Sequence, residues 1–335
     1  MSAPGRPKRE LLPLGGKARS AKGAPVRAGA PRIGRLVVVG VGLVGGSFAL
    51  GLKAAGRVDA VVGVGRGRAN LDAATALGII DRAIMIDTDW TRELVDADLV
   101  LLATPVAQFP ALFEAMAGRL PPHAVLTDAG STKQNVIAAA RRHLGAVLPR
   151  FVPGHPIAGT EHTGAAAAFA TLYRDRNVVL TPLPENDPEA VALVGALWTA
   201  CGARVQTLDP ATHDRIFAAV SHLPHLLAFA LVDLLAARPD AAEVFRYAAS
   251  GFRDFTRIAA GSPEMWRDIA LANRGALLAE IGAYRGELDR VAAMVAAGDG
   301  AALEAVFTRA AIARRAWGAQ FDAGAAVAAD GPREA

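Results

Sequence analysis

The sequence predicts an α/β protein, a doubly wound parallel sheet followed by an all-α helical domain. Two observations support this prediction. Short apolar runs alternate with segments of helical spacing as far as about residue 208, and such alternation indicates a parallel sheet covered by helices. Beyond that point only helical spacing remains. A chain of 335 residues is long enough for two domains of ordinary size.

Each element follows from a local pattern. The expected strands are short runs rich in valine and leucine, and the expected helices have apolar residues at helical spacing. The strands are residues 35–40, 60–64, 98–103 and 124–127, with further short strands at 150–153, 177–182 and 203–208. The helices are residues 47–55, 69–77, 111–120 and 132–144, then 212–237, 241–249, 263–296 and 301–317.

Positive charge is concentrated at the N-terminus. Residues 1–35 hold nine lysines or arginines and one acid, Glu10, whereas the whole chain has a formal net charge of +4. The rest of the chain is therefore net negative, which argues against a nucleic-acid partner for the folded body. We expect residues 1–32 to form a disordered basic leader, with a polyanion-binding arm as the alternative. Residues 324–335 are expected to be a frayed tail.

Composition disfavours several other classes of protein. The single cysteine, Cys201, excludes an internal disulfide framework and is expected to pack on a helix. No membrane span is expected, because the best candidate, residues 217–237, contains His222, His225 and Asp233. No metal site is expected, since the histidine spacings do not repeat a zinc pattern. These features favour a cytoplasmic protein.

A glycine-rich turn directly follows the first strand and opens the next helix. Gly40, Gly42 and Gly45 have GxGxxG spacing within a strand–helix–strand unit, which is the context of a Rossmann-type dinucleotide site. The first glycine permits the tight turn, the second lets the backbone approach a pyrophosphate, and the third lets helix and strand pack closely. Leu43 and Val44 complete the turn, and the helix N-terminus offers free N–H groups to phosphates.

The second strand should end in an acid that binds the ribose 2′-hydroxyl of NAD. This sequence has Gly65 there, followed by Arg66 and Arg68, and guanidinium groups suit a 2′-phosphate. We therefore favour NADP, or the use of both NAD and NADP, with two solvent-facing arginines as the alternative. Thr104 and Pro105 follow a later buried strand, and such strand ends form the ligand crevice of open α/β sheets.

The segment Phe151–Gly164 presents one imidazole on a stiff backbone. Proline disfavours helix in the residue before it, so His155, which precedes Pro156, should lie on a non-helical loop. A positioned, neutral imidazole is what a general base requires. Ser131 follows another strand end, and it is a candidate both for this crevice and for the N-cap of the next helix.

Three groups of motifs lie along the chain. They are GVGLVGGS from Gly40, TDAGSTK from Thr127 with FVPGHPIAGTEHTG from Phe151, and SHLPH from Ser221 with GFRDFTRIA from Gly251 and MWRDI from Met265. Together they resemble the prephenate dehydrogenase family of tyrosine biosynthesis, and the HPIAGTEHTG and GFRDFTRIA strings are the specific part. The resemblance implies NAD(P)-dependent oxidative decarboxylation of prephenate to 4-hydroxyphenylpyruvate, or of arogenate to tyrosine. It also implies a dinucleotide-binding domain at residues 33–208 and a helical substrate and homodimerisation domain at residues 209–323.

The resemblance further implies a role for each matching residue. His155 would take the proton of the ring hydroxyl, and Ser131 would orient both groups. The substrate contacts and the network around them would be His225, Arg253, Arg257, Glu161 and Trp266. Arg253 stands where relatives often carry a lysine. Arg253 and Arg257 would share one face of a helix and suit two carboxylates, with exposed helix charges as the alternative.

The remaining histidines are interpreted separately. His222 and His225 share an otherwise apolar helix with Pro224, which suggests a polar cavity there. His213 and Asp214 lie near a helix start and are interpreted as capping residues.

Two other functions stay open at this point. A β-hydroxyacid-type dehydrogenase would use a lysine of the helical domain as its base, but no lysine follows Lys133. A non-catalytic NAD(P)-binding sensor is disfavoured because His155, Ser131, Arg257 and the glycine turn are all present. No residue clearly selects between prephenate and arogenate.

Overall fold

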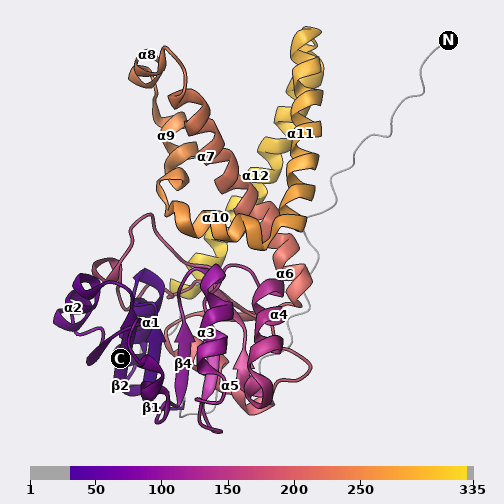
Figure 1. Cartoon of the computed structure of the whole chain (residues 1–335). Coiled ribbons are helices and arrows are strands. Elements are labelled where there is room, and N and C mark those ends of the chain that lie inside the picture. Colours follow the sequence, from indigo (N-terminus) through magenta and orange to yellow (C-terminus); the bar gives the residue numbers. More distant parts are fainter. Residues whose placement is uncertain (1–30, 330–335) are drawn as a thin grey trace. The chain divides into compact units, whose positions relative to one another are not determined.

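The structure, a computed structural model, describes residues 31–329 (Figure 1). The predicted basic leader, apart from its last two residues, and the end of the predicted tail therefore lie outside the described residues. Of the described residues, 31–288 form one compact unit and 289–329 belong to another.

A six-stranded parallel sheet organises the first part of the chain. Its strand order is β3-β2-β1-β4-β5-β6, and every neighbouring pair is parallel. The strands are β1 (Ile33–Val39), β2 (Val58–Gly65), β3 (Arg82–Met85), β4 (Leu99–Leu102), β5 (Val125–Asp128) and β6 (Phe151–Val152). The order reverses between β1 and β4, which is the switch point where open α/β sheets bind ligands. The predicted doubly wound fold is confirmed, although β3 was not predicted.

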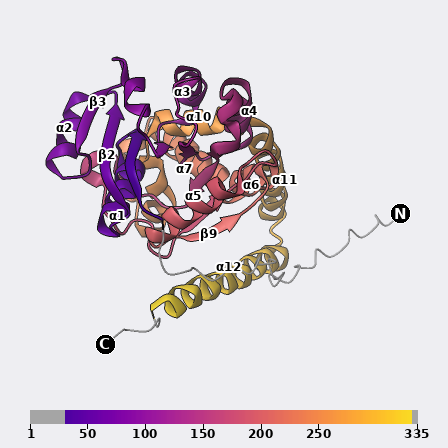
Figure 2. The same ribbon diagram turned by 90° about the horizontal axis from the view of Figure 1, so that it is seen from below.

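Helices cover both faces of this sheet (Figures 1 and 2). They are α1 (Leu43–Ala54), α2 (Arg68–Ala76), α3 (Phe109–Met116), α4 (Gln134–His143) and α5 (Pro188–Ala200). Alternate residues of β1 enter different cores. Leu36 and Val38 pack in the core that contains α1, α2 and α5, whereas Val37 and Val39 pack in the core that contains α3 and α4. Because both faces of β1 are buried from Leu36 to Val39, this part of its sequence is a continuous apolar run instead of an alternating one.

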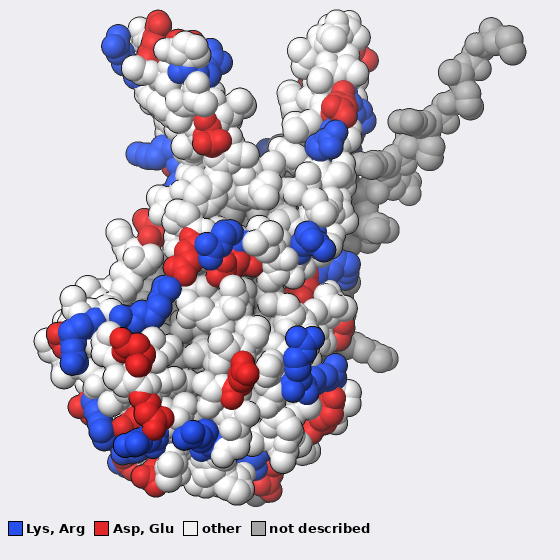
Figure 3. All heavy atoms as spheres, viewed as in Figure 1, with Lys and Arg blue, Asp and Glu red and all other residues white. Residues whose placement is uncertain are grey.

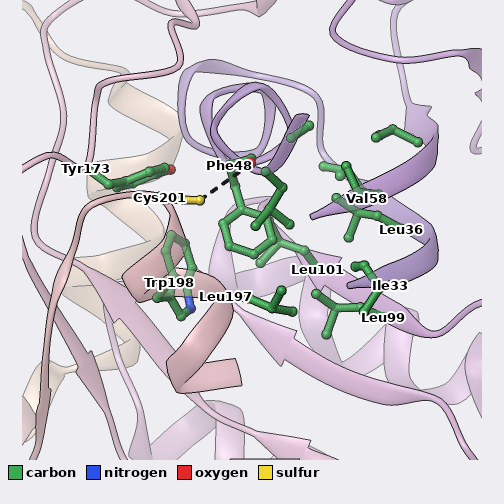
Figure 4. Packing of buried hydrophobic residues seen from close by; sticks show 14 of the residues in the cluster. Ile33, Leu36, Phe48, Val58, Leu99, Leu101, Tyr173, Leu197, Trp198 and Cys201 are labelled. Atoms are coloured by element: carbon green, nitrogen blue, oxygen red, sulfur yellow. Dashed lines mark hydrogen bonds between the residues drawn. The ribbon is translucent and has the colours of Figure 1, made fainter. Parts of the chain in front are cut away.

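Figure 4 shows part of the first of these cores. The rings of Phe48 and Trp198 pack with centroids 4.3 Å apart. Cys201 lies at the C-terminal end of α5, where its buried thiol contacts the carbonyl oxygen of Phe48 at 3.8 Å. Burial raises the pKa of Cys201 to about 12, so this thiol stays protonated and acts as a packing group.

A separate three-stranded sheet follows the main one. It contains β7 (Gly154–Pro156), β8 (Asn177–Leu180) and β9 (Arg204–Thr207), with β7 antiparallel to β8 and β8 parallel to β9. The strands expected at 177–182 and 203–208 therefore exist but do not extend the main sheet. The loop expected around His155 is a short strand, because β8 passes alongside and pairs His155 with Val179.

The rest of the compact unit is helical. Its elements are α6 (Pro210–Phe217), the π-helical turn η5 (Ala218–His222), α7 (Leu223–Ala236), α8 (Ala241–Arg246), α9 (Ser250–Thr256), the 3₁₀ turn η6 (Arg257–Ala260), α10 (Pro263–Ala272) and the start of α11 (Arg274–Ala296). The single helix expected at 212–237 is thus interrupted by η5, and the one expected at 263–296 is divided at Asn273. Helix α10 contacts the turn η2 (Val106–Gln108), so it lies at the carboxyl edge of β4.

The stretch Pro210–Ala236 is, among residues 31–329, the one helical segment long and apolar enough to cross a membrane. It contains the buried polar side chains of His213, Asp214 and His222. These groups bond to other parts of the fold, as described below, so we interpret the stretch as part of this helical domain.

The second unit contains α12 (Gly300–Ala329), which is longer than the predicted helix at 301–317. It includes residues that were expected to belong to the tail at 324–335. Within α12 the guanidinium carbon of Arg314 lies 4.7 Å from the ring centroid of Trp317.

The surface charge of the described residues is mixed. On the face drawn in Figure 3, lysines and arginines alternate with aspartates and glutamates, and no continuous basic area is present among the described residues on that face. The prediction that the body binds no nucleic acid stays a prediction.

Candidate active site

The glycine turn between β1 and α1 has the shape of a phosphate cradle. A Cβ atom on Gly40, whose φ is +101°, would lie 2.5 Å from the carbonyl oxygen of Ala103, and one on Gly45 would lie 2.3 Å from the carbonyl oxygen of Gly40. In contrast, a Cβ on Gly42 would meet no atom within 4 Å. The turn is therefore packed at its first and third glycines and open at the second, where a pyrophosphate would approach. No side chain caps the N-terminus of α1, so its N–H groups are available to an anion.

One further feature fits a ligand at this turn, and another holds the turn in place. Thr104, after β4, lies beside Gly40, and its Oγ1 atom is buried with no hydrogen-bond partner among the described residues. Buried hydroxyls normally have partners, so a polar group of a bound molecule is a natural one here. Asn70, which was not predicted as a site residue, donates to the carbonyl oxygen of Val41 (2.7 Å) and accepts from the N–H of Ala165 (2.8 Å). It ties the turn to the segment that follows His155.

The second strand ends without an acid, as predicted. Gly65 is its last residue, and Arg66 and Arg68 follow it on the surface. The guanidinium of Arg66 binds the carboxylate of Glu264 at the start of α10, which holds the pKa of Arg66 above and that of Glu264 below their usual values.

His155 lies at the same edge of the sheet as the glycine turn. The register aligns Val39 with Leu102 and Leu102 with Asp128, so the ends of β1, β4 and β5 form one edge. The backbone N–H of Gly154 donates to Asp128 at 3.0 Å, which fixes β7 beside the end of β5. His155 is buried, with 9% of its surface exposed.

The imidazole of His155 begins a chain of buried polar groups. Its Nδ1 atom lies 2.8 Å from Nε2 of His213, and Nδ1 of His213 lies 2.8 Å from Oδ1 of Asp214. Both partners come from α6. Sequence reasoning interpreted them as capping residues, which was incomplete, because the cap of α6 is Asp209.

Asp214 does cap a helix, but a different one. Its carboxylate accepts the backbone N–H groups of Lys133 (2.8 Å) and Gln134 (2.9 Å) at the start of α4. The prediction that Ser131 caps this helix is therefore wrong, since α4 begins at Gln134 and its N-cap residue is Lys133. Ser131 lies half-buried in the loop between β5 and α4, close enough in sequence to both to line the same edge.

A buried ion pair holds the loop between β5 and α4 in place. Lys133 and Asp128 are fully buried and bonded to each other, and Lys133 also donates to the carbonyl oxygen of Gly154. Asp128 accepts the backbone N–H of Gly130 at 2.7 Å. Burial lowers the pKa of Lys133 and raises that of Asp128, while each partner opposes the shift of the other. The pair ties the Ser131 loop to the His155 strand, and sequence reasoning did not find it.

The turn η5 places two more histidines near α10. His222 is buried, and its Nδ1 atom lies 3.1 Å from Nδ2 of Asn273. His225, one turn further on, stacks on Trp266 with ring centroids 3.6 Å apart and planes 21° apart. π-helical turns occur frequently at functional sites, and this one ends at His222, three residues before His225 in α7. The resemblance implied that both residues belong to the substrate site, but their stacking on each other was not predicted.

The two arginines of the GFRDFTRIA string have different surroundings. Arg257 opens η6 and lies 3.3 Å from Glu161, in the segment after His155. The side chain of Arg253 is 77% exposed and pairs with its neighbour Asp254 at 3.4 Å. Since α9 ends at Thr256, the two arginines do not share one regular helix face, and only Arg257 is joined to the segment of His155.

Burial keeps the histidines of this region neutral. It lowers the pKa of His155 well below the ordinary value, helped by the nearby His213, Lys133 and His222. Burial also lowers the pKa of His225, and it lowers the pKa of His222 to about 4. It lowers the pKa of His213 as well, although the hydrogen bond to Asp214 acts in the opposite direction. A neutral imidazole at pH 7 can accept a proton, which is the state that base catalysis requires.

Three comparisons place this arrangement among known proteins. Residues 48–207 match the family model described as "Prephenate dehydrogenase, nucleotide-binding domain", and residues 209–309 match "Prephenate dehydrogenase, dimerization domain". The chain is 34% identical over 267 residues to the cyclohexadienyl dehydrogenase of Zymomonas mobilis, and the matched region covers 79% of this chain and 89% of that protein. It is 36% identical over 261 residues to the prephenate dehydrogenase of Bacillus subtilis, covering 76% and 68% respectively. A crystal structure of prephenate dehydrogenase from A. aeolicus, in complex with hydroxyphenyl propionate and NAD+, superimposes with a TM-score of 0.78 at 34% identity, covering 84% of this chain and 97% of that one.

Proposed function

The chain belongs to the prephenate dehydrogenase family, and we propose that it converts prephenate to 4-hydroxyphenylpyruvate by NAD(P)-dependent oxidative decarboxylation. One observation supports this proposal most: a buried, neutral imidazole, that of His155, lies at the sheet edge that carries the open phosphate cradle. Arogenate, which would yield tyrosine, is the second candidate substrate.

The cofactor would be held by the turn at Gly40–Gly45, with its pyrophosphate over Gly42 and at the N-terminus of α1. When bound, the nicotinamide accepts a hydride from C4 of the substrate ring. Arg66 and Arg68 suit the 2′-phosphate of NADP, and Gly65 leaves no carboxylate at the strand end to repel that phosphate. The use of both NADP and NAD is the alternative.

His155 would act through its Nε2 atom. That atom takes the proton of the C4 hydroxyl as the hydride leaves, so C4 becomes a carbonyl carbon. The ring carboxylate then departs as CO2, its bonding electron pair aromatises the ring, and the resulting phenolate oxygen takes the proton back from His155. The proton is returned, so the net change is one hydride transferred and one CO2 released. Ser131 would orient the hydroxyl toward the imidazole.

The substrate carboxylates would be bound by the helical part. Arg257 is the stronger candidate for a carboxylate contact, because it pairs with Glu161, a residue of the segment that follows His155. Arg253 is the weaker candidate, because it pairs with its own exposed neighbour Asp254. The stacked rings of His225 and Trp266 would pack against the side chain of the substrate.

A homodimer would complete the molecule. The matched helical domain is the dimerization domain of the family. Apolar side chains of α7 and α11 are exposed in the single chain, among them Leu234 (66%), Leu278 (59%) and Leu288 (50%). We propose that a second copy covers them, which light scattering of the full chain would test. A cytoplasmic location stays a prediction.

A four-way assay tests the proposed function. Prephenate and arogenate are each incubated with NAD+ and with NADP+, and reduced nicotinamide is followed by absorbance. We expect turnover with at least one combination containing prephenate. Turnover with arogenate alone would shift the assignment to the second substrate, and no turnover in any combination would contradict the proposal.

A further inference from the structure

We propose that His213 and Asp214 are positioning residues that hold His155 in the one tautomer able to act as a base. This inference rests on the proposed function, because it concerns the proton that His155 accepts. Sequence reasoning assigned neither residue to the reaction.

The argument follows from which atoms can donate. An ionised carboxylate only accepts hydrogen bonds, so Nδ1 of His213, at 2.8 Å from Oδ1 of Asp214, must carry a hydrogen. A neutral imidazole has one N–H, so Nε2 of His213 has a lone pair. Nε2 of His213 lies 2.8 Å from Nδ1 of His155, so Nδ1 of His155 must be the donor of this hydrogen bond. The lone pair of His155 is then on Nε2, the atom that has no hydrogen bond within the described part of the chain.

Asp214 is suited to set this order. Its burial acts to raise its pKa, but hydrogen bonds from His213 and from the N–H groups of Gln134 and Lys133 outweigh burial, and the pKa of Asp214 lies below its ordinary value. The carboxylate is thus ionised at neutral pH. Because it is also held by the start of α4, it cannot rotate away from His213 without losing two backbone hydrogen bonds.

The same chain leaves a protonated His155 with a hydrogen-bond acceptor, because Nε2 of a neutral His213 accepts from Nδ1 of His155 in either state. Three charged groups face the rings of His155 and His213. Lys133 disfavours a positive charge on either ring, whereas Asp128 and Asp214 favour a positive charge on His213. The neutral ring of His222 also lies near His155. With Lys133 paired to Asp128, Asp214 is the carboxylate aligned with the imidazole chain. A protonated His155 would therefore keep its hydrogen bond to His213, whose orientation Asp214 fixes.

The direct test is nuclear magnetic resonance of the full-length protein with ¹⁵N-labelled histidine. Nitrogen shifts distinguish a protonated from an unprotonated ring nitrogen, and the signals of His155 are those lost in a His155→Asn variant. We expect hydrogen on Nδ1 of His155 at neutral pH. A hydrogen on Nε2 would overturn the inference, whatever the activity of the protein.

A matched pair of variants tests the consequence for turnover. In His213→Gln the amide oxygen can still accept from Nδ1 of His155, whereas in His213→Leu nothing can. We expect His213→Leu to lower kcat by about a hundredfold or more, His213→Gln to lower it by about tenfold or less, and KM to change by less than about threefold in both. The ¹⁵N spectrum of His213→Leu should also show His155 with hydrogen on Nε2.

Equal losses in the two folded variants, or no loss in either, would overturn the inference. If His213→Leu does not fold, the tautomer of the wild-type protein and the kcat of His213→Gln still decide it. The wild-type assay separates this outcome from failure of the proposed function, since only an active wild-type enzyme shows a loss that depends on residue 213.

Discussion

The guanidinium of Arg66 meets the carboxylate of Glu264 through two contacts, Nη1 to Oε1 at 3.1 Å and Nη2 to Oε2 at 3.2 Å. Arg66 follows the strand that would bind the adenosine ribose, and Glu264 lies two residues before Trp266. The side chains are 61% and 41% exposed, so the pair contributes little to stability. Its importance is that Glu264 occupies the guanidinium that a 2′-phosphate would need.

Opposite effects on cofactor preference are expected from changing the two partners. Glu264→Gln removes the competing charge, so the apparent affinity for NADP+ should rise by about threefold to tenfold with little change for NAD+. Arg66→Ala should lower the affinity for NADP+ by about tenfold or more. Titrations of each cofactor with each variant measure both ratios. A strong wild-type preference for NAD+ that Arg66→Ala leaves unchanged would contradict the assignment of Arg66 to the 2′-phosphate.

The glycine turn predicts a contrast between two alanine variants. Gly42→Ala meets no atom of the chain, so its melting temperature should match that of wild type, while its methyl group obstructs a pyrophosphate. We expect cofactor affinity to fall by about tenfold to a hundredfold, which corresponds to about 1.4–2.8 kcal/mol. Gly45→Ala places its Cβ 2.3 Å from the carbonyl oxygen of Gly40 and should lower the melting temperature clearly. Normal cofactor binding by Gly42→Ala would argue against this turn as the pyrophosphate site.

The two arginines should differ in their effect on substrate binding. Charge-assisted hydrogen bonds are worth about 1.5–3 kcal/mol, so Arg257→Ala should raise the KM for prephenate by about tenfold to a hundredfold. Arg253→Ala should raise it less, because Arg253 is more exposed and is not joined to the segment of His155. Initial rates over a range of prephenate concentrations test the order. A larger effect from Arg253 would mean that substrate binds further along α9 than proposed.

Stability should fall as the solution becomes mildly acidic. His155, His213, His222 and His225 have folded-state pKa values below the ordinary value, mainly because they are buried. In the unfolded chain these histidines titrate at about pH 6.5. The stability that they contribute is therefore present above that pH and is lost as the pH falls below it.

Urea unfolding at about pH 7.5 and about pH 5.5 measures this effect, since most carboxylates stay ionised across that interval. We expect a smaller free energy of unfolding at the lower pH, and a smaller difference between the two in a His222→Asn variant. An unfolding free energy that is equal or larger at the lower pH would contradict the burial of these rings in the neutral form.

Local patterns were enough to predict five of the six strands of the main sheet and the cofactor turn. The valine-rich run of β1 and the glycines that follow it are adjacent in sequence, so their meaning does not depend on distant residues. The proline pattern singled out His155, although it predicted a loop there, and the resemblance added Arg257 and Trp266 to the candidate site. The strand β7 exists because β8, more than twenty residues later, supplies its hydrogen-bonding partner.

The supports of the site could not be predicted in this way, because they depend on tertiary contacts. The bond between His155 and His213 joins residues 58 positions apart, and Asp214 caps a helix whose first residue, Gln134, lies 80 positions earlier in the chain. A serine just before a helix is a good N-cap by local rules, yet here the N–H groups at the start of α4 are bound by Asp214, which is distant in sequence. The π-helical turn at Ala218–His222 has no distinctive residue type, so the pattern there predicted a regular helix.

The central claim, that His155 is the base, is tested most directly by the His155→Asn variant. Asparagine is similar in size and polarity but cannot accept a proton at neutral pH. Turnover of prephenate and equilibrium binding of substrate should be measured on the same folded preparation. We expect kcat to fall by about a hundredfold to ten-thousandfold while the substrate Kd changes by less than about tenfold. A variant that binds normally and retains turnover within about tenfold of wild type would contradict the account.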